Sequence, residues 1–116
     1  MPVIKVWCLP ASQSENELRL LHKAIVAAVV AIPELELHGE QNMTCLFPPD
    51  RMQYGLGEEI VVEVTGLFET SKRTHMVRWL MAEAIGLKIR SLYPDSKVEV
   101  FVYPFNQDIS AFWGMD

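Results

Sequence analysis

The same order of apolar patterns occurs twice along this chain, and this doubling restricts the possible fold more than any other feature. Residues 3–9 and 60–68 are rich in Val, Ile, Leu and aromatic side chains, which is typical of strands. Each stretch leads into a helical pattern and then into a further strand-like run, residues 43–47 and 98–105. The chain is therefore predicted to contain one strand, helix and strand unit used twice.

The two halves, residues 1–47 and 58–105, are offset by somewhat under sixty positions. A parallel pair of strands joined through a helix has a right-handed crossover, so both helices come to lie on the same face of one sheet. Residues 48–57 contain Pro and Gly and are expected to form a loop or an irregular hairpin connection between the halves. We predict an α+β fold that occupies residues 1–116 as a single domain.

Both helical segments carry a start signal and an apolar stripe. Ser14 and Glu17 have the spacing of a capping box, and Thr70 or Ser71 is the expected N-cap of the second helix. The stripes, at spacings of three and four, are Leu18, Leu21, Ile25, Ala28, Val29 and Ile32, then Met76, Val77, Leu80, Met81, Ala84 and Ile85. Each helix is therefore predicted to cover the sheet with this stripe.

The strands carry apolar residues on both faces. Val61 lies next to Val62, and Val100 lies next to Phe101, so neighbouring apolar side chains point to opposite sides of the sheet. The helices cover only one of these sides, and packing against copies of the same chain would cover the other. We predict a closed homo-oligomer.

Charge and hydropathy exclude several classes of function. The formal net charge is −5, and Lys and Arg are dispersed along the chain, so a surface that follows nucleic-acid phosphates is not expected. The longest apolar run, residues 24–32, is far shorter than a membrane span, and the N-terminus lacks the pattern of a secretory signal. We therefore expect a cytoplasmic protein that binds neither nucleic acid nor membrane.

The two cysteines, Cys8 and Cys45, lie far apart in sequence, each inside an apolar run. This placement indicates two small buried thiols rather than a metal site or a redox pair. A lone disulfide between them is the alternative.

Pro2 offers the most specific chemistry in the chain. If the initiator methionine is removed, Pro2 carries a free secondary amine, and the strand that follows would hold this amine inside the fold. Apolar surroundings destabilise the charged form of an amine, so the pKa of such an amine falls toward neutrality. Pro2 is therefore a candidate general base.

Several stretches together resemble the tautomerase superfamily, in particular its single-chain, doubled members of the macrophage migration inhibitory factor type. They are the opening residues Met1 to Ile4, the turn from Pro49 to Gly55, the pair Gly66 and Leu67, and the aromatic tail from Tyr103 to Trp113. The resemblance implies a β-α-β-β-α-β fold, with two helices on one face of a four-stranded mixed sheet and a short C-terminal strand. It also implies a homotrimer in which the N-terminal proline lies at a pocket between subunits.

The resemblance further implies that Pro2 moves a proton between carbon and oxygen in a small keto or enol acid, without a cofactor or a metal. The candidate substrate-binding residues are His38, Arg51, Tyr54, Leu67, Phe101 and Tyr103. Lys5, Arg51 and Arg73 are candidate anion binders, although each is more often a solvated surface charge.

The sequence departs from these relatives at Glu99, where they have a polar pocket residue. A carboxylate beside Pro2 would stabilise the protonated amine and raise its pKa, which opposes base catalysis at neutral pH. A retained Met1 would convert the nitrogen of Pro2 into an amide. The second hypothesis is therefore a catalytically silent protein of this fold that acts through binding or interaction.

Overall fold

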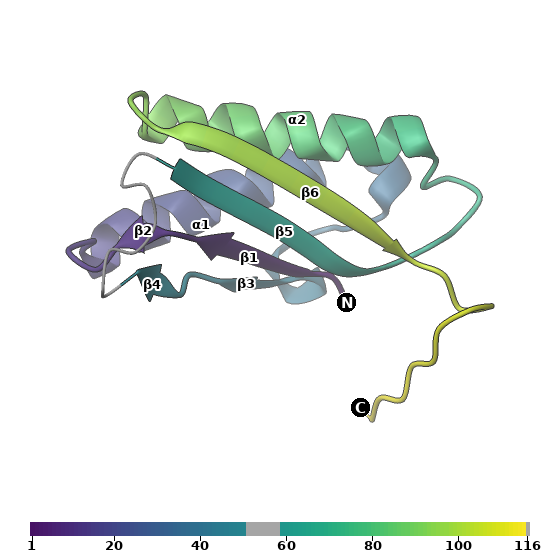
Figure 1. Ribbon diagram of the computed structural model, residues 1–116. Coiled ribbons are helices and arrows are strands. Elements are labelled where there is room, and N and C mark those ends of the chain that lie inside the picture. The colour runs from purple at the N-terminus through teal and green to yellow at the C-terminus, as the bar shows by residue number, and fades with distance from the viewer. Residues whose placement is uncertain (51–58, 116) are drawn as a thin grey trace.

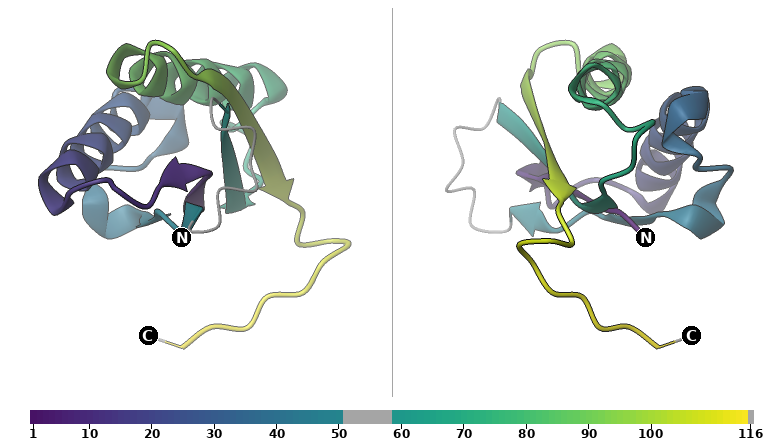
Figure 2. Two further views of the ribbon diagram at one scale, coloured as in Figure 1. Left: turned by 60° about the vertical axis from the view of Figure 1, so that its left-hand side comes forward. Right: turned by 90° about the vertical axis from the view of Figure 1, so that its right-hand side faces the viewer.

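The computed structural model describes residues 1–50 and 59–115. Its main sheet has four strands in the order β3-β1-β5-β6, and both long helices lie on one face of this sheet (Figures 1 and 2). The strands of the sheet and the two helices that cover it are, in chain order, β1 (Val3–Trp7), α1 (Glu15–Val30), β3 (Thr44–Leu46), β5 (Glu59–Phe68), α2 (His75–Leu92) and β6 (Lys97–Phe105). The predicted α+β fold, with two helices on a four-stranded mixed sheet, is confirmed.

Short elements fill the connections between these six. The two-residue strands β2 (Leu9–Pro10) and β4 (Pro49–Asp50) pair in parallel beside the main sheet. Two 3₁₀ turns, η1 (Pro33–Leu35) and η2 (Glu40–Asn42), follow α1. β6 is the last strand of the described chain, and residues 106–115 extend away from the body of the molecule (Figure 1).

The strand pairing follows from the two halves. β1 runs parallel to β3 and β5 runs parallel to β6, as two crossover units require. The halves join through β1 and β5, which are antiparallel and place Ile4 opposite Val64 and Val6 opposite Val62. The antiparallel join brings the start of β1 beside the end of β5.

The core lies between the sheet and the helices. Every second residue of β1 and of β5 up to Val64 is buried there, among them Ile4, Val6 and Val62, each with no exposed surface. Leu21 of α1 and Ile85 of α2 are equally buried, and no described residue with a polar or charged side chain is buried. Burial of such apolar side chains stabilises the fold by roughly 1.5–3 kcal/mol each, before entropy is counted.

The capping box of α1 is confirmed, but the predicted N-cap of α2 is wrong. Ser14 Oγ accepts a hydrogen bond from Glu17 N, and Glu17 in turn accepts one from Ser14 N. α2 is capped by Thr74, whose hydroxyl accepts from Val77 N, rather than by Thr70 or Ser71. The start is later because Thr70 closes a separate turn, in which it accepts hydrogen bonds from Arg73 N through its carbonyl and hydroxyl oxygens.

The predicted apolar stripe of α2 is only partly buried. Val77, Met81 and Ile85 face the core together with Ile89, whereas Met76 is 62% exposed and Leu80 is 38% exposed. A spacing of four from 77 to 89 keeps a single narrow stripe against the sheet. The helix is apolar on several sides, so spacing alone does not identify the buried side.

The sheet face opposite the helices has no element packed on it in the described chain (Figure 2). Trp7 Nε1 donates a 2.7 Å hydrogen bond to Glu63 Oε1 across β1 and β5 on this face. Phe101 and Tyr103 stack with a centroid distance of 6.3 Å, and they are 43% and 46% exposed. This open face is therefore partly apolar, as the strand pattern predicts.

Cys8 and Cys45 are both half-buried, and no disulfide joins these two described residues. Burial raises the pKa of the Cys45 thiol to about 11 from an ordinary value of 9.0.

Among the described residues, no group of three or more His, Cys, Asp or Glu side chains is arranged to hold a metal ion. Within the same residues, no helix has both the length and the apolar character needed to cross a bilayer.

Cys45 is expected to react slowly with iodoacetamide in the folded protein. The thiolate is the nucleophile, and a pKa raised from 9.0 to about 11 lowers its population at pH 8 by about 100-fold. The rate should rise about tenfold per pH unit until the pH nears 11. Mass spectrometry of the peptide that contains Cys45 would measure labelling, with urea-unfolded protein as the control. Equal rates in folded and unfolded protein would contradict the burial of this thiol.

Candidate functional site

Pro2 is buried immediately before β1 and is held from two sides. Its carbonyl oxygen accepts a 2.9 Å hydrogen bond from Thr44 N at the start of β3. On the other side lies Gly66 of β5, with a φ of +72°. A Cβ at Gly66 would lie 3.2 Å from the carbonyl oxygen of Met1 and 3.8 Å from Pro2 Cα, so glycine permits this close approach.

A pocket of about 330 Å³ lies beside Pro2. This volume falls in the range of small-molecule sites. The strands contribute Gly66 and Phe68 to it, and the residues from the connections are Glu36, Leu37, Asn42 and Arg73, with Met1 and Pro2 completing the lining. The pocket therefore forms where the start of β1, the end of β5 and the segment after α1 meet.

Arg73 is the fixed cation of this pocket. Its Nε and Nη2 donate to the carbonyl oxygen of Leu35 at 3.1 and 2.7 Å, and Nη1 donates to the carbonyl oxygen of Phe68 at 2.9 Å. Among the described residues, no carboxylate lies within ion-pair distance of Arg73. These bonds use three of the five N–H groups of the guanidinium, which leaves two to meet a ligand.

Glu36 is the one acidic residue among the described lining residues, and it has its own partner. Its Oε2 lies 3.8 Å from Lys72 Nζ, and both side chains are about half exposed or more. An ion pair this exposed contributes little to stability, and the Glu36 carboxylate does not lie within ion-pair distance of Arg73. The charged side chains of the described lining are therefore Arg73 and Glu36, and only Glu36 is paired, with Lys72 outside the lining. The unpaired guanidinium favours an anionic ligand.

The predicted site residues lie in three different places. Leu67 is 1% exposed and follows Gly66, so it packs in the core behind the pocket. His38 is exposed and lies against α1, although its neighbour Leu37 lines the Pro2 pocket. Arg51 and Tyr54 lie outside the described residues.

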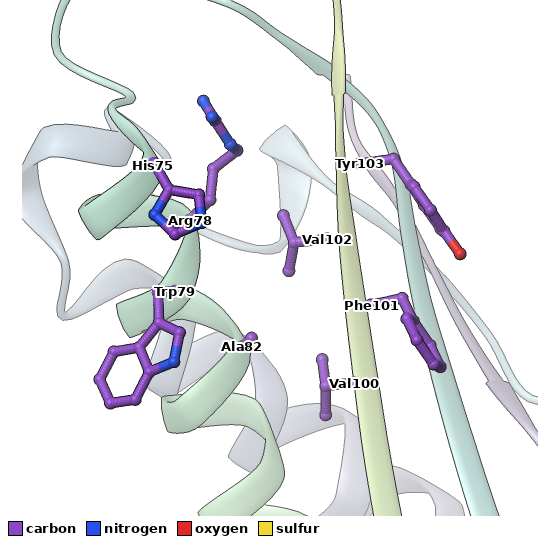
Figure 3. Close-up of a pocket in the computed structure, with 8 residues that line it drawn as sticks. All are labelled: His75, Arg78, Trp79, Ala82, Val100, Phe101, Val102 and Tyr103. Carbon is purple, nitrogen blue, oxygen red and sulfur yellow. The ribbon is translucent and has the colours of Figure 1, made fainter.

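Phe101 and Tyr103 project from β6 on the side away from α2, as Figure 3 shows. Val100 and Val102, on the other side of the strand, point toward α2 and Trp79 (Figure 3). The two aromatic rings therefore lie on the open face of the sheet. They do not line the Pro2 pocket of their own chain.

Glu99 is remote from Pro2 within the chain. The register places Glu99 opposite Val61, five residues along β5 from Gly66. At about 3.3 Å per residue, this separation is roughly 17 Å. Lys5, a candidate anion binder, also lies away from the pocket, because it pairs with Glu63 in the middle of the sheet.

The sequence identifies Arg73 only as one of three candidate anion binders, and it gives no indication that Glu36, Asn42 or Phe68 lines the site. One signal was present. If β1 and β5 pair in antiparallel fashion, the residues that follow Gly66 must lie next to Pro2. Phe68 and Arg73 are the next side chains along this path that line the pocket.

Solved structures share the fold of this chain across nearly its whole length. Native fused 4-OT superposes with a TM-score of 0.72 at 15% identity and covers 97% of this chain and 94% of its own. The F6 fused 4-OT asymmetric trimer gives a TM-score of 0.71 at 14% identity, with coverages of 97% and 94%. An FG41 malonate semialdehyde decarboxylase inhibited by 3-bromopropiolate gives a TM-score of 0.65 at 14% identity. The match covers 99% of this chain and 91% of the decarboxylase chain.

Comparison of the amino-acid sequence with family models and with curated proteins gives no match. The structural neighbours named above are members of the tautomerase superfamily. The chain therefore has the fold of the tautomerase superfamily, as the resemblance in its sequence predicts.

Proposed function

We propose that this protein is a cofactor-independent tautomerase or isomerase in which Pro2, once Met1 is removed, is the general base. The observation that carries the proposal is the pocket whose lining includes both buried Pro2 and the fixed Arg73 guanidinium. The amine of Pro2 would take a proton from the carbon next to a carbonyl group, giving an enolate and a protonated amine. The protonated amine would then return the proton at another position of the substrate.

Arg73 has two roles in this proposal. Its two remaining N–H groups would bind the carboxylate of a small keto or enol acid, or the oxygen that gains charge as the enolate forms. Its positive charge would also disfavour the protonated form of the Pro2 amine and so lower the pKa of that amine. Both roles require a cation in a fixed position. The hydrogen bonds to the carbonyl oxygens of Leu35 and Phe68 hold the Arg73 guanidinium in place.

The structural neighbours are consistent with small unsaturated acids as ligands. One, Pt0534, is inactivated by 2-oxo-3-pentynoate, with a TM-score of 0.67 and 15% identity. Another, a malonate semialdehyde decarboxylase, was solved as wild type, as a mutant and in an inactivated form, with a TM-score of 0.59. At 11–15% identity these structures share the fold, and the transfer of chemistry to Pro2 is our proposal.

We further propose a cytoplasmic homotrimer of single-domain chains. The open face of the sheet supports oligomerisation, since Trp7, Phe101 and Tyr103 are only partly covered there. Two fused 4-OT neighbours are described as trimers. In such an assembly, Phe101 and Tyr103 would approach a Pro2 pocket only across a subunit boundary.

Covalent labelling by 3-bromopropiolate tests the proposal. Protein from its native source should lack Met1 by intact mass, and the reagent should add one label to the peptide that begins at Pro2. The control carries two extra residues ahead of Pro2, which turn its nitrogen into an amide, and it should remain unlabelled. Retained Met1, or equal labelling of the control, would contradict the proposal and favour a catalytically silent binding protein.

A further inference from the structure

The segment from the end of η1 through η2 borders two pockets. Leu37 and Asn42 line the Pro2 pocket, whereas residues 38–40 line a groove against α1. The groove has a volume of about 500 Å³ and is larger than the pocket beside Pro2. The two are separate cavities with no lining residue in common.

One stripe of α1 forms the floor of the groove. Its residues are Arg19, His22, Lys23, Val26, Ala27 and Val30, at spacings of three and four. This stripe is distinct from the buried stripe of Leu21, Ile25, Ala28 and Val29 that faces the sheet. α1 therefore has a second apolar face, on which Val26 and Val30 are half-buried at the edge of the core and Ala27 is exposed.

The groove is polar at one end and apolar at the other. Arg19, His22 and Lys23 come first along the helix, and the apolar residues Val26, Ala27 and Val30 follow. At 1.5 Å per residue, the distance along the axis from Lys23 to Val30 is about 10 Å. A ligand that fits must carry its polar group at one end and an apolar body of about this length.

The charges at the polar end favour an anion. Arg19 is paired with Glu15, but no carboxylate of the described chain lies within ion-pair distance of Lys23. The ring of His22 meets the ring of Phe47 edge to face at a centroid distance of 6.3 Å, and His38 is a further lining residue of the groove. Among the described lining residues, Glu40 is the only carboxylate, although the chain as a whole has a net charge of −5.

We propose that this groove is a second ligand site that takes a free amphipathic monocarboxylate. The carboxylate would bind Lys23 with His22 or His38 as a further donor, since a histidine ring donates at least one N–H in either tautomer. The alkyl or aryl body would lie over Val26, Ala27 and Val30, whose exposed apolar surface it would remove from water. The site is independent of proton transfer at Pro2.

Isothermal titration with decanoate tests this site, because its ten-carbon chain matches the length of the groove. Wild-type protein should bind one decanoate per chain. Lys23→Gln should weaken binding by about fivefold, the effect of about 1 kcal/mol from one exposed ion pair. Ala27→Phe should weaken it at least tenfold by filling the groove, and the exposed position of Ala27 should leave the fold unchanged by circular dichroism.

Three controls make the result specific. Lys88→Gln removes an exposed lysine from α2 and should leave binding unchanged. Pro2→Ala should also leave it unchanged, which separates the groove from the Pro2 pocket. Decanol, which lacks the charge, should bind more weakly than decanoate. The proposal is overturned by no binding, by equal binding to Ala27→Phe, by loss of binding in Pro2→Ala, or by binding to phosphatidylglycerol vesicles in place of free decanoate.

Discussion

Replacement of Pro2 by alanine is expected to lower kcat/KM for ketonisation of phenylpyruvate or 2-hydroxymuconate by about 10²-fold or more. A positioned general base contributes roughly 10²–10⁴-fold to proton transfer. Alanine keeps an amine at the N-terminus, but it loses the ring that fixes the direction of the nitrogen. The contacts that hold residue 2, from Thr44 N and Gly66, would then fix the carbonyl and the Cα but not the amine.

The measurement is the ultraviolet absorbance of the enol, followed with processed protein that lacks Met1. Pro10→Ala is the matched control, because Pro10 is an exposed proline in β2 and its replacement makes the same chemical change away from the pocket. Its kcat/KM should stay within about twofold of wild type. Unchanged activity in Pro2→Ala would reject Pro2 as the base, whatever the fold.

The topology could be predicted because the information for it is local. Alternating and helical periodicities identify each element, and the handedness of crossovers then leaves few ways to arrange two strand, helix and strand units. The capping box at Ser14 shows the same principle, since the signal and its partner Glu17 lie three residues apart. Such local features can be predicted from the sequence without knowing which distant residues are in contact.

The site could not be predicted in the same way, since its contacts join distant parts of the sequence. Arg73 binds the carbonyl oxygen of Leu35, which lies 38 positions earlier, and no local pattern around either residue indicates this pair. The hydrogen bonds from Arg73 N to Thr70 close a separate turn ahead of the helix, so the predicted cap at Thr70 or Ser71 was wrong. Arg73 therefore takes part in both features, through its side chain in the pocket and through its backbone N–H in the turn before α2.

Arg73→Met should reduce both the stability and the proposed activity. The substitution leaves the carbonyl oxygens of Leu35 and Phe68 without their charged donor in a partly buried setting. Hydrogen bonds to charged groups contribute about 1.5–3 kcal/mol each, so loss of the donor to these two carbonyl oxygens should lower the free energy of unfolding by about 3–6 kcal/mol. Loss of the cation should lower kcat/KM for a keto acid by about 10²-fold, the usual effect of removing one charge-stabilising donor.

Arg73→Lys separates these two effects. Lysine keeps the positive charge but lacks the planar fork that reaches two carbonyl oxygens at once, so stability should fall by about half as much while more activity is retained. Lys72→Gln is the matched control, because it removes a neighbouring exposed charge whose ion pair with Glu36 is worth little. Urea unfolding and steady-state kinetics would be measured on all three variants. If Arg73→Met loses stability but keeps its activity toward a keto acid, Arg73 is a structural residue only, because the loss of the bonds to Leu35 and Phe68 would then be its whole effect.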